Sequence, residues 1–327
     1  MVLFCIEMII VTGAVGFIGS CLIKKLNEFG IGSIVAVDDF SNPEKNKNLV
    51  NKTIYKQVER FEFIENPGAF GKPDFIFHIG ARTDTTEFDT ALLQKLNTNY
   101  TIQLWKYAAE HNIPFIYASS AATYGLGDNS FDDDPKFLPT LKPLNPYGQS
   151  KHDFDLWAIK QTKTPPFWAG LKFFNVFGPN EYHKGRMASV VMHGTSQIRE
   201  NNSIKLFRSH HKDYQDGEQV RDFIYVKDVL DVLIYLYNSR PESGIYNLGT
   251  GKARSWNDLA KAIFGSLNKT VNIQYTDIPA DIRDKYQYFT EAKMQKLVQT
   301  GYNRAFTTLE DAVADYINNY LLTLSYY

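Results

Sequence analysis

The chain has 327 residues, of which 44% are hydrophobic and 22% charged, and its formal net charge at pH 7 is -1. This length exceeds one ordinary domain, so we expect two lobes and a large buried core. A net charge near zero gives no reason to expect a nucleic acid or a membrane surface as a partner.

The chain begins with an apolar stretch, residues 1–7, that lacks the basic start and the small-residue cleavage site of a signal peptide. We expect it to be a short extension before Met8, and no later apolar stretch approaches the roughly 18 residues of a membrane span. Cys5 and Cys21 are too few for a disulfide framework or a metal cluster, and we expect both to be small core residues. We therefore expect a cytoplasmic protein without a bound metal.

A glycine-rich turn follows the first predicted strand. Residues 8–12 are apolar and predict a buried parallel strand, after which Gly13, Gly16 and Gly19 open a helix that runs to Leu26. Glycines at this spacing allow a tight turn, close approach of a pyrophosphate and close packing of helix on strand. The free N–H groups of the helix N-terminus then point at the phosphates. The pattern predicts a dinucleotide site.

The second predicted strand, residues 33–38, ends in an acid. Asp38 lies about 20 residues after the glycine turn, where an acid binds a ribose hydroxyl. Asp38 and Asp39 together repel a 2′-phosphate and favour NAD, whereas Lys45 and Lys47 can neutralise such a phosphate and favour NADP. The residues alone leave both cofactors open.

Strands and helices alternate through the next part of the chain. Further strands are predicted at residues 74–79, 115–118 and 167–174, and helices at 89–98, 99–110 and 146–160. This alternation predicts an α/β fold with a parallel, doubly wound sheet. Right-handed crossovers place the strand ends along one edge of the sheet. The residues expected to line one crevice there are Gly13, Asp38, Gly80, Ala81, Arg82, Ser120 and Asn175.

Three residues in this region carry acid/base chemistry. Tyr147 and Lys151 are four residues apart, so they share one helix face with about 5–6 Å between their Cβ atoms. A cation beside a phenol lowers its pKa, normally about 10, toward working pH, which makes the phenolate a general base for a hydroxyl. Ser120 ends a parallel strand and can donate a hydrogen bond to the same substrate oxygen.

The amino-acid composition of the chain changes after Asn175. We expect residues 1–176 to form the nucleotide-binding domain and residues 177–327 mainly a substrate-binding domain, with returns to the first domain near residues 221–251. Residues 206–220 are polar and predict a loop. The two adjacent histidines in it lack the spacing of metal ligands and are expected to be loop residues.

These features resemble the extended short-chain dehydrogenase/reductase superfamily of nucleotide-sugar epimerases and dehydratases, over nearly the whole chain. The local runs at 117–125, 174–179, 183–189 and 286–290 resemble the ADP-glycero-manno-heptose 6-epimerases. This resemblance implies a Rossmann-type sheet with a smaller, discontinuous C-terminal substrate domain. It also implies an isomerase that converts ADP-D-glycero-D-manno-heptose to ADP-L-glycero-D-manno-heptose through a 6-keto intermediate, for lipopolysaccharide inner-core heptose. The family forms homo-oligomers, pentamers by this resemblance.

The resemblance assigns roles to particular residues. It implies Tyr147 and Lys184 as two acid/base groups, with Ser120 polarising the oxygen between them. It places against the cofactor Gly13, Gly16, Phe17, Ile18, Gly19, Asp38, Asp39, Lys45, Ile79, Gly80, Ala81, Arg82, Thr83, Asn99, Lys151, Val176 and Lys184. It places against the ADP-sugar Asn175, Arg186, His193, Phe207, Arg208, Ser209, His210, Arg221 and Tyr286. The alternatives are a solvated or cofactor-holding Lys184, and a His193 that either fills the core or shares a helix face with Arg186.

The chain also departs from the family. Ile79 stands where the family has an acid, Arg82 and Thr83 replace Cys and Ser, and Arg186 replaces a serine. These changes put the contacts at those positions in doubt. The family generally uses NADP, so we expect NADP here, with NAD as the alternative.

Two other functions fit parts of the sequence. The chain could be another nucleotide-sugar 4-epimerase or dehydratase, but Ala121 and Ala122 occupy the place where 4,6-dehydratases carry an Asp-Glu pair, and alanines cannot drive elimination of water. A non-enzymatic dinucleotide sensor with the same fold would tend to lose the Tyr147–Lys151 pair, which this chain has.

Overall fold

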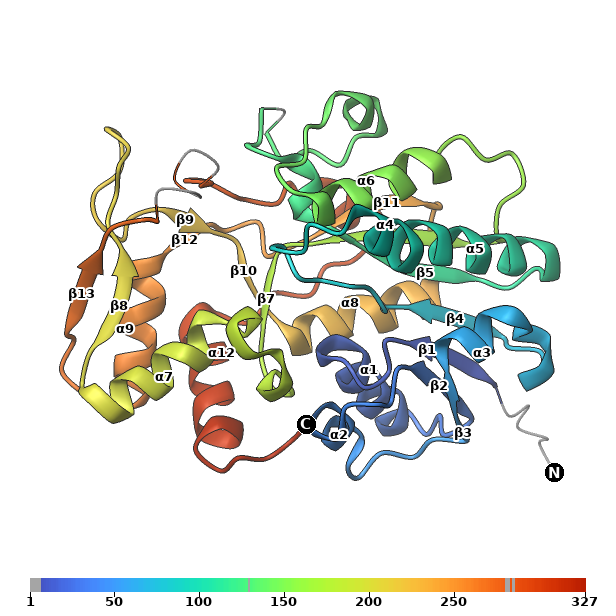
Figure 1. Ribbon diagram of the computed structural model, residues 1–327, viewed down its shortest axis with the longest axis horizontal. Coiled ribbons are helices and arrows are strands. Elements are labelled where there is room, and N and C mark those ends of the chain that lie inside the picture. The colour runs from blue at the N-terminus through green and yellow to red at the C-terminus, as the bar shows by residue number, and fades with distance from the viewer. Residues whose placement is uncertain (1–6, 129, 280–282, 284–285) are drawn as a thin grey trace.

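The computed structural model describes residues 7–128, 130–279, 283 and 286–327. Residues 1–6 and Cys5, for which an extension and a core residue were predicted, lie outside the described residues. A parallel sheet of seven strands forms the centre of the described chain (Figure 1). In spatial order the strands are β11 (Gly244–Leu248), β6 (Trp168–Phe173), β5 (Phe115–Ser120), β4 (Phe75–His78), β1 (Ile9–Thr12), β2 (Ile34–Asp38) and β3 (Lys56–Glu59).

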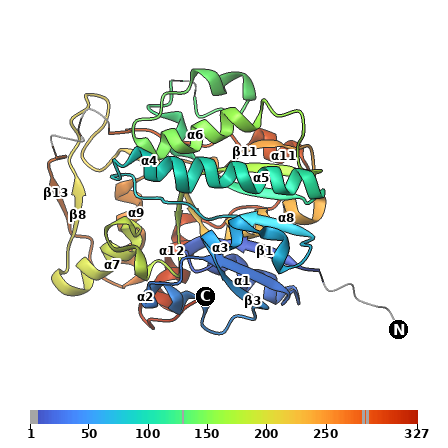
Figure 2. The same cartoon turned by 45° about the vertical axis from the view of Figure 1, so that its right-hand side comes forward.

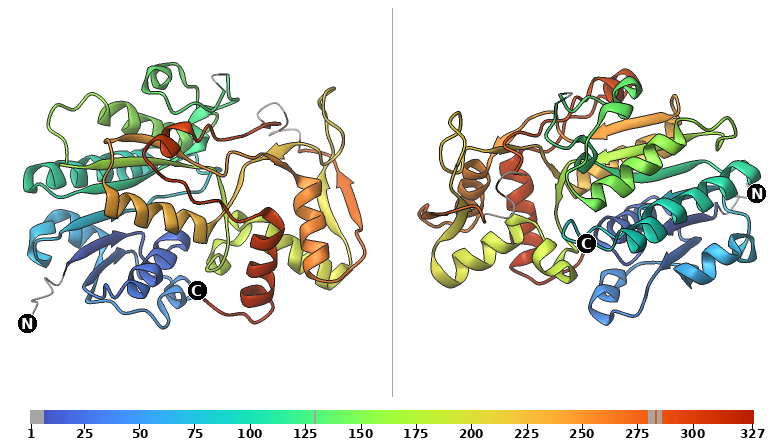
Figure 3. Two further views of the ribbon diagram at one scale, coloured as in Figure 1. Left: turned by 180° about the vertical axis from the view of Figure 1, so that it is seen from behind. Right: turned by 45° about the horizontal axis from the view of Figure 1, so that its top comes forward.

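Helices cover both faces of this sheet, which explains why its central strands are buried along their whole length. On one face α5 (Tyr100–His111) and α6 (Pro146–Ala158) lie side by side, as Figure 2 shows. On the other face α1 (Phe17–Glu28) packs against α8 (Val226–Ser239), and Figure 3 shows the pair from behind. The predicted doubly wound α/β fold is therefore confirmed.

The remaining elements lie beyond the carboxyl edge of the sheet or connect its strands. In the smaller group to the left of Figure 1, α7, α9 and α12 pack together beside the parallel pair β8–β13. The elements of this group and of its connection to the sheet are β7 (Asn175–Phe177), η6 (Tyr182–Met187), α7 (Val190–Asn201), β8 (Ile204–Phe207), β9 (Val220–Arg221), β10 (Phe223–Tyr225), β12 (Arg254–Ser255), α9 (Trp256–Ser266), β13 (Ile273–Thr276), α12 (Leu309–Tyr316) and η7 (Ile317–Leu321). The connecting helices are α2 (Pro43–Asn46), η1 (Lys47–Leu49), α3 (Arg60–Glu65), η2 (Pro67–Phe70), α4 (Thr90–Leu93), η3 (Gln94–Asn99), η4 (Ala121–Tyr124), η5 (Pro135–Thr140) and α11 (Gln295–Gln299).

The last strand of the sheet comes from the second half of the chain. After the smaller group has begun, β11 pairs in parallel with β6 and forms an edge of the sheet. At the opposite edge lies β3, which the sequence did not predict because only Val58 of its four residues is buried. No helix in the described ranges is long and apolar enough to cross a bilayer.

Candidate active site

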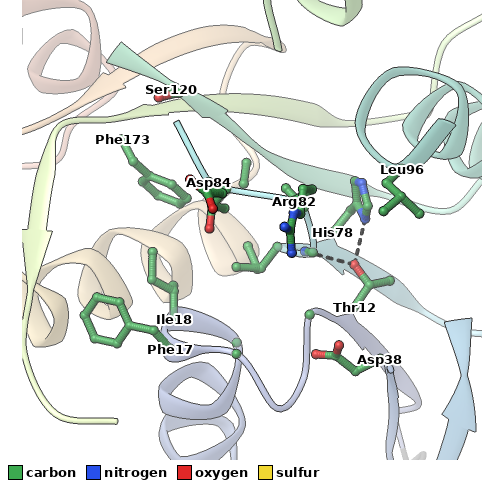
Figure 4. A pocket seen from close by; sticks show the side chains of 18 of the residues that line it. Thr12, Phe17, Ile18, Asp38, His78, Arg82, Asp84, Leu96, Ser120 and Phe173 are labelled. Atoms are coloured by element: carbon green, nitrogen blue, oxygen red, sulfur yellow. Dashed lines mark hydrogen bonds between the residues drawn. The ribbon is translucent and has the colours of Figure 1, made fainter. Parts of the chain in front are cut away.

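A cavity of about 530 Å³ opens at the carboxyl edge of the sheet, within the usual size range of ligand sites. The ends of β1, β2, β4 and β5, the start of α6 and the η6 segment all contribute to its wall. Figure 4 shows Thr12 and Asp38 on one side of it and Ser120 and Phe173 on the other. Of the predicted site residues, those in the wall are Gly13, Gly16, Phe17, Ile18, Gly19, Asp38, Lys45, Ile79, Gly80, Ala81, Arg82, Thr83, Ser120, Tyr147, Lys151, Val176 and Lys184.

The glycine turn leaves no space for a Cβ atom at Gly13 or Gly19. A Cβ on Gly13, whose φ is +69°, would lie 2.6 Å from the Gly80 Cα, and a Cβ on Gly19 would lie 2.1 Å from the Gly13 oxygen. Helix α1 begins directly after Gly16, and no side chain caps its N-terminus. Its first N–H groups therefore remain open to an anion, as a dinucleotide pyrophosphate requires. This cradle fits the predicted nicotinamide cofactor.

A cation pairs with each of the two acids at the end of β2, Asp38 and Asp39. The buried Asp38 carboxylate accepts hydrogen bonds from the Val15 N–H at 3.0 Å and from Lys45 Nζ at 2.7 Å. Arg60, at the start of α3, also lines the cavity and lies 3.2 Å from the Asp39 carboxylate. The Nε of Arg60 is buried without a hydrogen-bond partner in the described structure. A further acceptor, such as a phosphate oxygen, would satisfy this group.

The first turn of α6 places the catalytic candidates. The Asn145 side chain caps the helix by accepting from the Gly148 N–H at 2.8 Å, which fixes the helix start two residues before Tyr147. One turn later Lys151 Nζ donates to the Ala118 carbonyl at 2.8 Å. The Ser120 side chain acts on the Tyr147 hydroxyl and lowers its pKa. Ser120, Tyr147 and Lys151 thus meet at one wall of the cavity, as the sequence predicted.

The protonation of these groups differs from the expectation. Burial raises the pKa of Tyr147, and the interaction with Ser120 offsets this only in part. Burial also lowers the pKa of Lys151 to about 8, with Asp155 acting in the opposite direction. The net lowering of the Tyr147 pKa that the sequence predicted is therefore not seen in this structure, because desolvation of the phenolate dominates.

A second lysine reaches the cavity from η6. Lys184 Nζ lies 5.0 Å from the ring centre of Phe17 and 3.6 Å from Glu181 Oε2. The fully buried Glu181 accepts from the N–H groups of Gly178 at 3.0 Å and Ser189 at 2.7 Å. One carboxylate therefore holds the backbone on both sides of Lys184 and fixes the place from which this side chain projects.

The departures from the family meet at the mouth of the cavity. Arg186 Nη2 donates to both carboxylate oxygens of Asp84, at 3.1 and 3.0 Å, and Arg82 Nη2 donates to Glu87 at 3.0 Å. Figure 4 shows Arg82 and Asp84 close together in this region. The expected sharing of one helix face by Arg186 and His193 is wrong, because η6 ends at Met187 and His193 belongs to α7.

Three of the predicted substrate residues, Phe207, Arg221 and Tyr286, form a second group outside the cavity wall. The buried Arg221 guanidinium lies 5.2 Å from the ring centre of Tyr286 and 5.7 Å from that of Trp256. Phe207 packs edge-on against Tyr286 with ring centres 6.0 Å apart. Predicted residues that lie outside the wall and outside this aromatic group are Asp39, Asn99, Asn175, Arg186, His193, Arg208, Ser209 and His210. The exposed ones among them are Asn99, Asn175, Arg186, Arg208 and His210.

The sequence did not predict two residues of the site, His78 and Asn97. His78 is buried 2.6 Å from the Thr12 hydroxyl and 2.8 Å from that of Thr101, and burial lowers its pKa to about 3, so it is neutral. Its place at the end of an apolar strand was a usable signal. Asn97 holds the backbone of Arg82, accepting from its N–H at 2.8 Å and donating to its carbonyl at 3.0 Å. The π-helical turn η3 changes which side chains face the sheet, so regular helix spacing could not identify Asn97.

Comparison with known proteins agrees with this geometry. The sequence pattern of the NAD dependent epimerase/dehydratase family matches residues 9–249. The chain is 46% identical over 325 residues to an ADP-L-glycero-D-manno-heptose-6-epimerase of Fusobacterium nucleatum, covering 96% of this chain and 98% of that one. It is 48% identical over 317 residues to the enzyme of the same name from Nitratidesulfovibrio vulgaris, with the same coverage of 96% and 98%.

Solved structures give the same result. An ADP-L-glycero-D-manno-heptose-6-epimerase of Helicobacter pylori superimposes with a TM-score of 0.78 at 26% identity, covering 96% of each chain. A UDP-N-acetylglucosamine 4-epimerase of Methanobrevibacter ruminantium, at 22% identity and a TM-score of 0.81 over 98% of this chain and 99% of that one, shares the fold. The cradle, the Ser120–Tyr147–Lys151 wall and these matches show that the chain belongs to the NAD dependent epimerase/dehydratase family, and within it to the ADP-glycero-manno-heptose 6-epimerases that its motifs resembled.

Proposed function

We propose that this protein inverts C6″ of ADP-D-glycero-D-manno-heptose to give ADP-L-glycero-D-manno-heptose through a 6-keto intermediate. The observation that carries the proposal is a single cavity holding the glycine cradle, the Ser120–Tyr147–Lys151 wall and Lys184 from η6. The names of the relatives at 46% and 48% identity support this choice of sugar.

The roles of the side chains follow from this placement. In the oxidation step Tyr147, as the phenolate, takes the proton of the C6″ hydroxyl while Ser120 hydrogen-bonds to the same oxygen. A nicotinamide cofactor held by the glycine cradle and Lys151 would supply the acceptor and the donor of the C6″ hydride. Rotation of the exocyclic carbonyl group presents its second face and moves its oxygen away from Tyr147. Lys184 then supplies the proton on that side, since its ammonium reaches the cavity from another element.

We propose NADP rather than NAD as the cofactor. Asp38 and Asp39 alone would repel a 2′-phosphate, but Lys45 and Arg60 lie against these carboxylates. Arg60 Nε makes no hydrogen bond and lies 3.9 Å from the Glu59 carboxylate, so it still offers a donor for a phosphate oxygen. Lys47, also expected to help, instead pairs with the exposed Glu44 at 2.6 Å and does not line the cavity. The coarser assignment, a nicotinamide cofactor, is supported by the family match.

We assign the ADP-sugar to the second group of residues. The planar fork of Arg221 suits a pyrophosphate, and the rings of Phe207, Tyr286 and Trp256 beside it suit an adenine. Residues 177–327 are then mainly the substrate-binding domain, and Asn175, Arg186, His193 and residues 207–210 remain predicted contacts. We further expect a cytoplasmic homo-oligomer. Light scattering of the purified protein tests its oligomeric state.

The decisive experiment incubates the purified protein with ADP-D-glycero-D-manno-heptose and follows the C6″ configuration by NMR. Inversion at C6″ is expected, and a Tyr147→Phe variant serves as the inactive control. UDP-glucose and UDP-N-acetylglucosamine are offered in parallel reactions. Inversion at C4 of either sugar without change at C6″ of the heptose would favour a 4-epimerase, and loss of water would favour a dehydratase despite Ala121 and Ala122.

A further inference from the structure

A fully buried ion pair lies behind the catalytic residues and has no part in the chemistry proposed above. Asp155 and Lys172 are both 0% exposed, and Lys172 Nζ lies 2.8 Å from Asp155 Oδ2. The same carboxylate accepts from the Tyr117 hydroxyl at 2.9 Å and from the Ser119 hydroxyl at 2.7 Å. Apolar residues of similar volume are often as stable as a buried ion pair, so stability alone does not explain this one.

The carboxylate belongs to the same helical stripe as the catalytic pair. Asp155 follows Lys151 by one turn on the buried side of α6, as Lys151 follows Tyr147. Any displacement of Asp155 along the strand face would therefore move both catalytic side chains with it.

The partners of Asp155 belong to the strand end that carries Ser120. Ser119 and Lys172 lie opposite each other on β5 and β6. Lys172 Nζ also donates to the Thr123 hydroxyl at 2.6 Å, which in turn donates to the Ser120 carbonyl at 2.8 Å. The network thus joins the helix of Tyr147 to the strand of Ser120.

The charge of Asp155 also acts on Lys151. Burial lowers the pKa of Lys151 to about 8, and Asp155 opposes this effect. The other titratable groups near this network are His78 on β4, Tyr117 on β5, Tyr124 on η4, Lys172 on β6, and Tyr147 and His152 on α6. Burial lowers the pKa of both histidines from 6.5, so neither is charged at pH 8. Asp155 is therefore the anion in this set.

We propose that Asp155 is a positioning residue for the Tyr147–Lys151 pair, because it fixes α6 against β5 and its negative charge, one helical turn away, acts on the Lys151 ammonium. This rests on the proposed function in taking Lys151 as a cofactor-binding cation. Without the carboxylate, Lys151 loses its proton at a lower pH.

The test compares Asp155→Asn with Asp153→Asn, a matched control on the same helix. Asp153 is partly exposed and accepts from the Gln149 amide at 2.7 Å. In protein freed of cofactor, NADPH binding is measured by fluorescence from about pH 6 to about pH 9. The parent protein should bind well below pH 8 and lose affinity as the pH rises through the Lys151 pKa of about 8. In Asp155→Asn this loss should move down by about one pH unit, with parent affinity restored near the acid end.

Asp153→Asn should leave the pH of this loss unchanged. An unshifted profile in Asp155→Asn, or a deficit equal at every pH, would overturn the proposal. The readout needs no sugar, so it stays informative even if the assigned substrate is wrong. If the unpaired Lys172 prevents folding, the double variant Asp155→Leu/Lys172→Met removes both charges together. A smaller downward shift is expected there, because the Lys172 cation is lost together with the carboxylate, and the absence of any shift would again reject the role.

Discussion

Burial raises the pKa of Tyr147 and the interaction with Ser120 lowers it, so both effects set the acid/base behaviour of this hydroxyl. Tyr147→Phe removes the hydroxyl and keeps the ring, so the variant should retain its fold and its cofactor. We expect kcat to fall by at least about 10²-fold, the usual scale for loss of an acid/base group. Steady-state assays with circular dichroism check this, and turnover close to that of the parent would contradict the role of Tyr147.

Lys184 and Tyr147 should serve opposite faces of the same carbonyl. A 6″-aldehyde analogue of the sugar nucleotide lets each half-reaction run separately. Lys184→Met should impair formation of one C6″ configuration and Tyr147→Phe the other, each by about 10²-fold. Product configuration is read by NMR. Equal impairment of both configurations by Lys184→Met would reduce this residue to a binding role.

Arg60 should decide the preference for NADP. Arg60→Ala removes a cation that lines the cavity, and loss of one charge-assisted phosphate contact should weaken NADP binding by about tenfold with little effect on NAD. Lys47→Ala is the matched control, because Lys47 pairs with exposed Glu44 outside the cavity wall. Fluorescence titration with both reduced cofactors gives the ratio. Equal weakening of NAD and NADP would argue against a 2′-phosphate contact at Arg60.

Among individual residues, the sequence identified those whose chemistry depends on a strand end or a helix start. The glycine turn, Asp38, Ser120 and the Tyr147–Lys151 pair are of this kind, and the structure brings them to one cavity. Arg60 was not predicted to be a site residue, because it follows a polar edge strand that gives no hydrophobic signal. The pKa of Tyr147 could not be predicted, since it depends on burial rather than on spacing.

Among the elements, the contact between Arg186 and Asp84 joins η6 to the segment after β4 across the cavity mouth. The Arg186 side chain is 64% exposed, and exposed ion pairs contribute at most about 1 kcal/mol, a factor of about five. Arg186→Ala should therefore speed exchange of bound cofactor by up to about fivefold. Exchange is followed by chasing labelled NADP with an excess of unlabelled cofactor.

Arg254→Ala is the control for this exchange, since Arg254 forms comparable pairs with Asp258 and Glu310 away from the cavity wall. Asp84→Asn should reproduce the effect of Arg186→Ala, and the double variant should add nothing further. Additive effects would show that the two side chains act separately.

Elements with a continuous apolar run were predictable from the chain, and those that depend on a neighbour were not. β4, β5 and β6 lie within or close to their predicted ranges, because buried parallel strands must be apolar on both faces. The two-residue strands β9 and β12 pair with each other through tertiary contact alone. No local pattern in so short a segment could have predicted them.

For the whole molecule, a reaction that returns the same hydride requires the cofactor to stay in place. We expect purified protein to carry bound cofactor, which denaturation should release as NADP, with NAD as a minor component. Enzymatic cycling assays on the supernatant distinguish the two. A preparation that is fully active without any bound cofactor would contradict internal recycling of the hydride.

The place of β11 in the sheet has a consequence for synthesis on the ribosome. Until residues 244–248 have emerged, β6 keeps one side of its backbone without its final strand partner. Nascent chains that end between β6 and β11 are therefore the forms of this protein most open to pairing with another chain. Segments beyond the sheet, from α7 to β10, must be made before the sheet can close. The order of translation thus couples completion of the cofactor-binding sheet to synthesis of the segments that follow it.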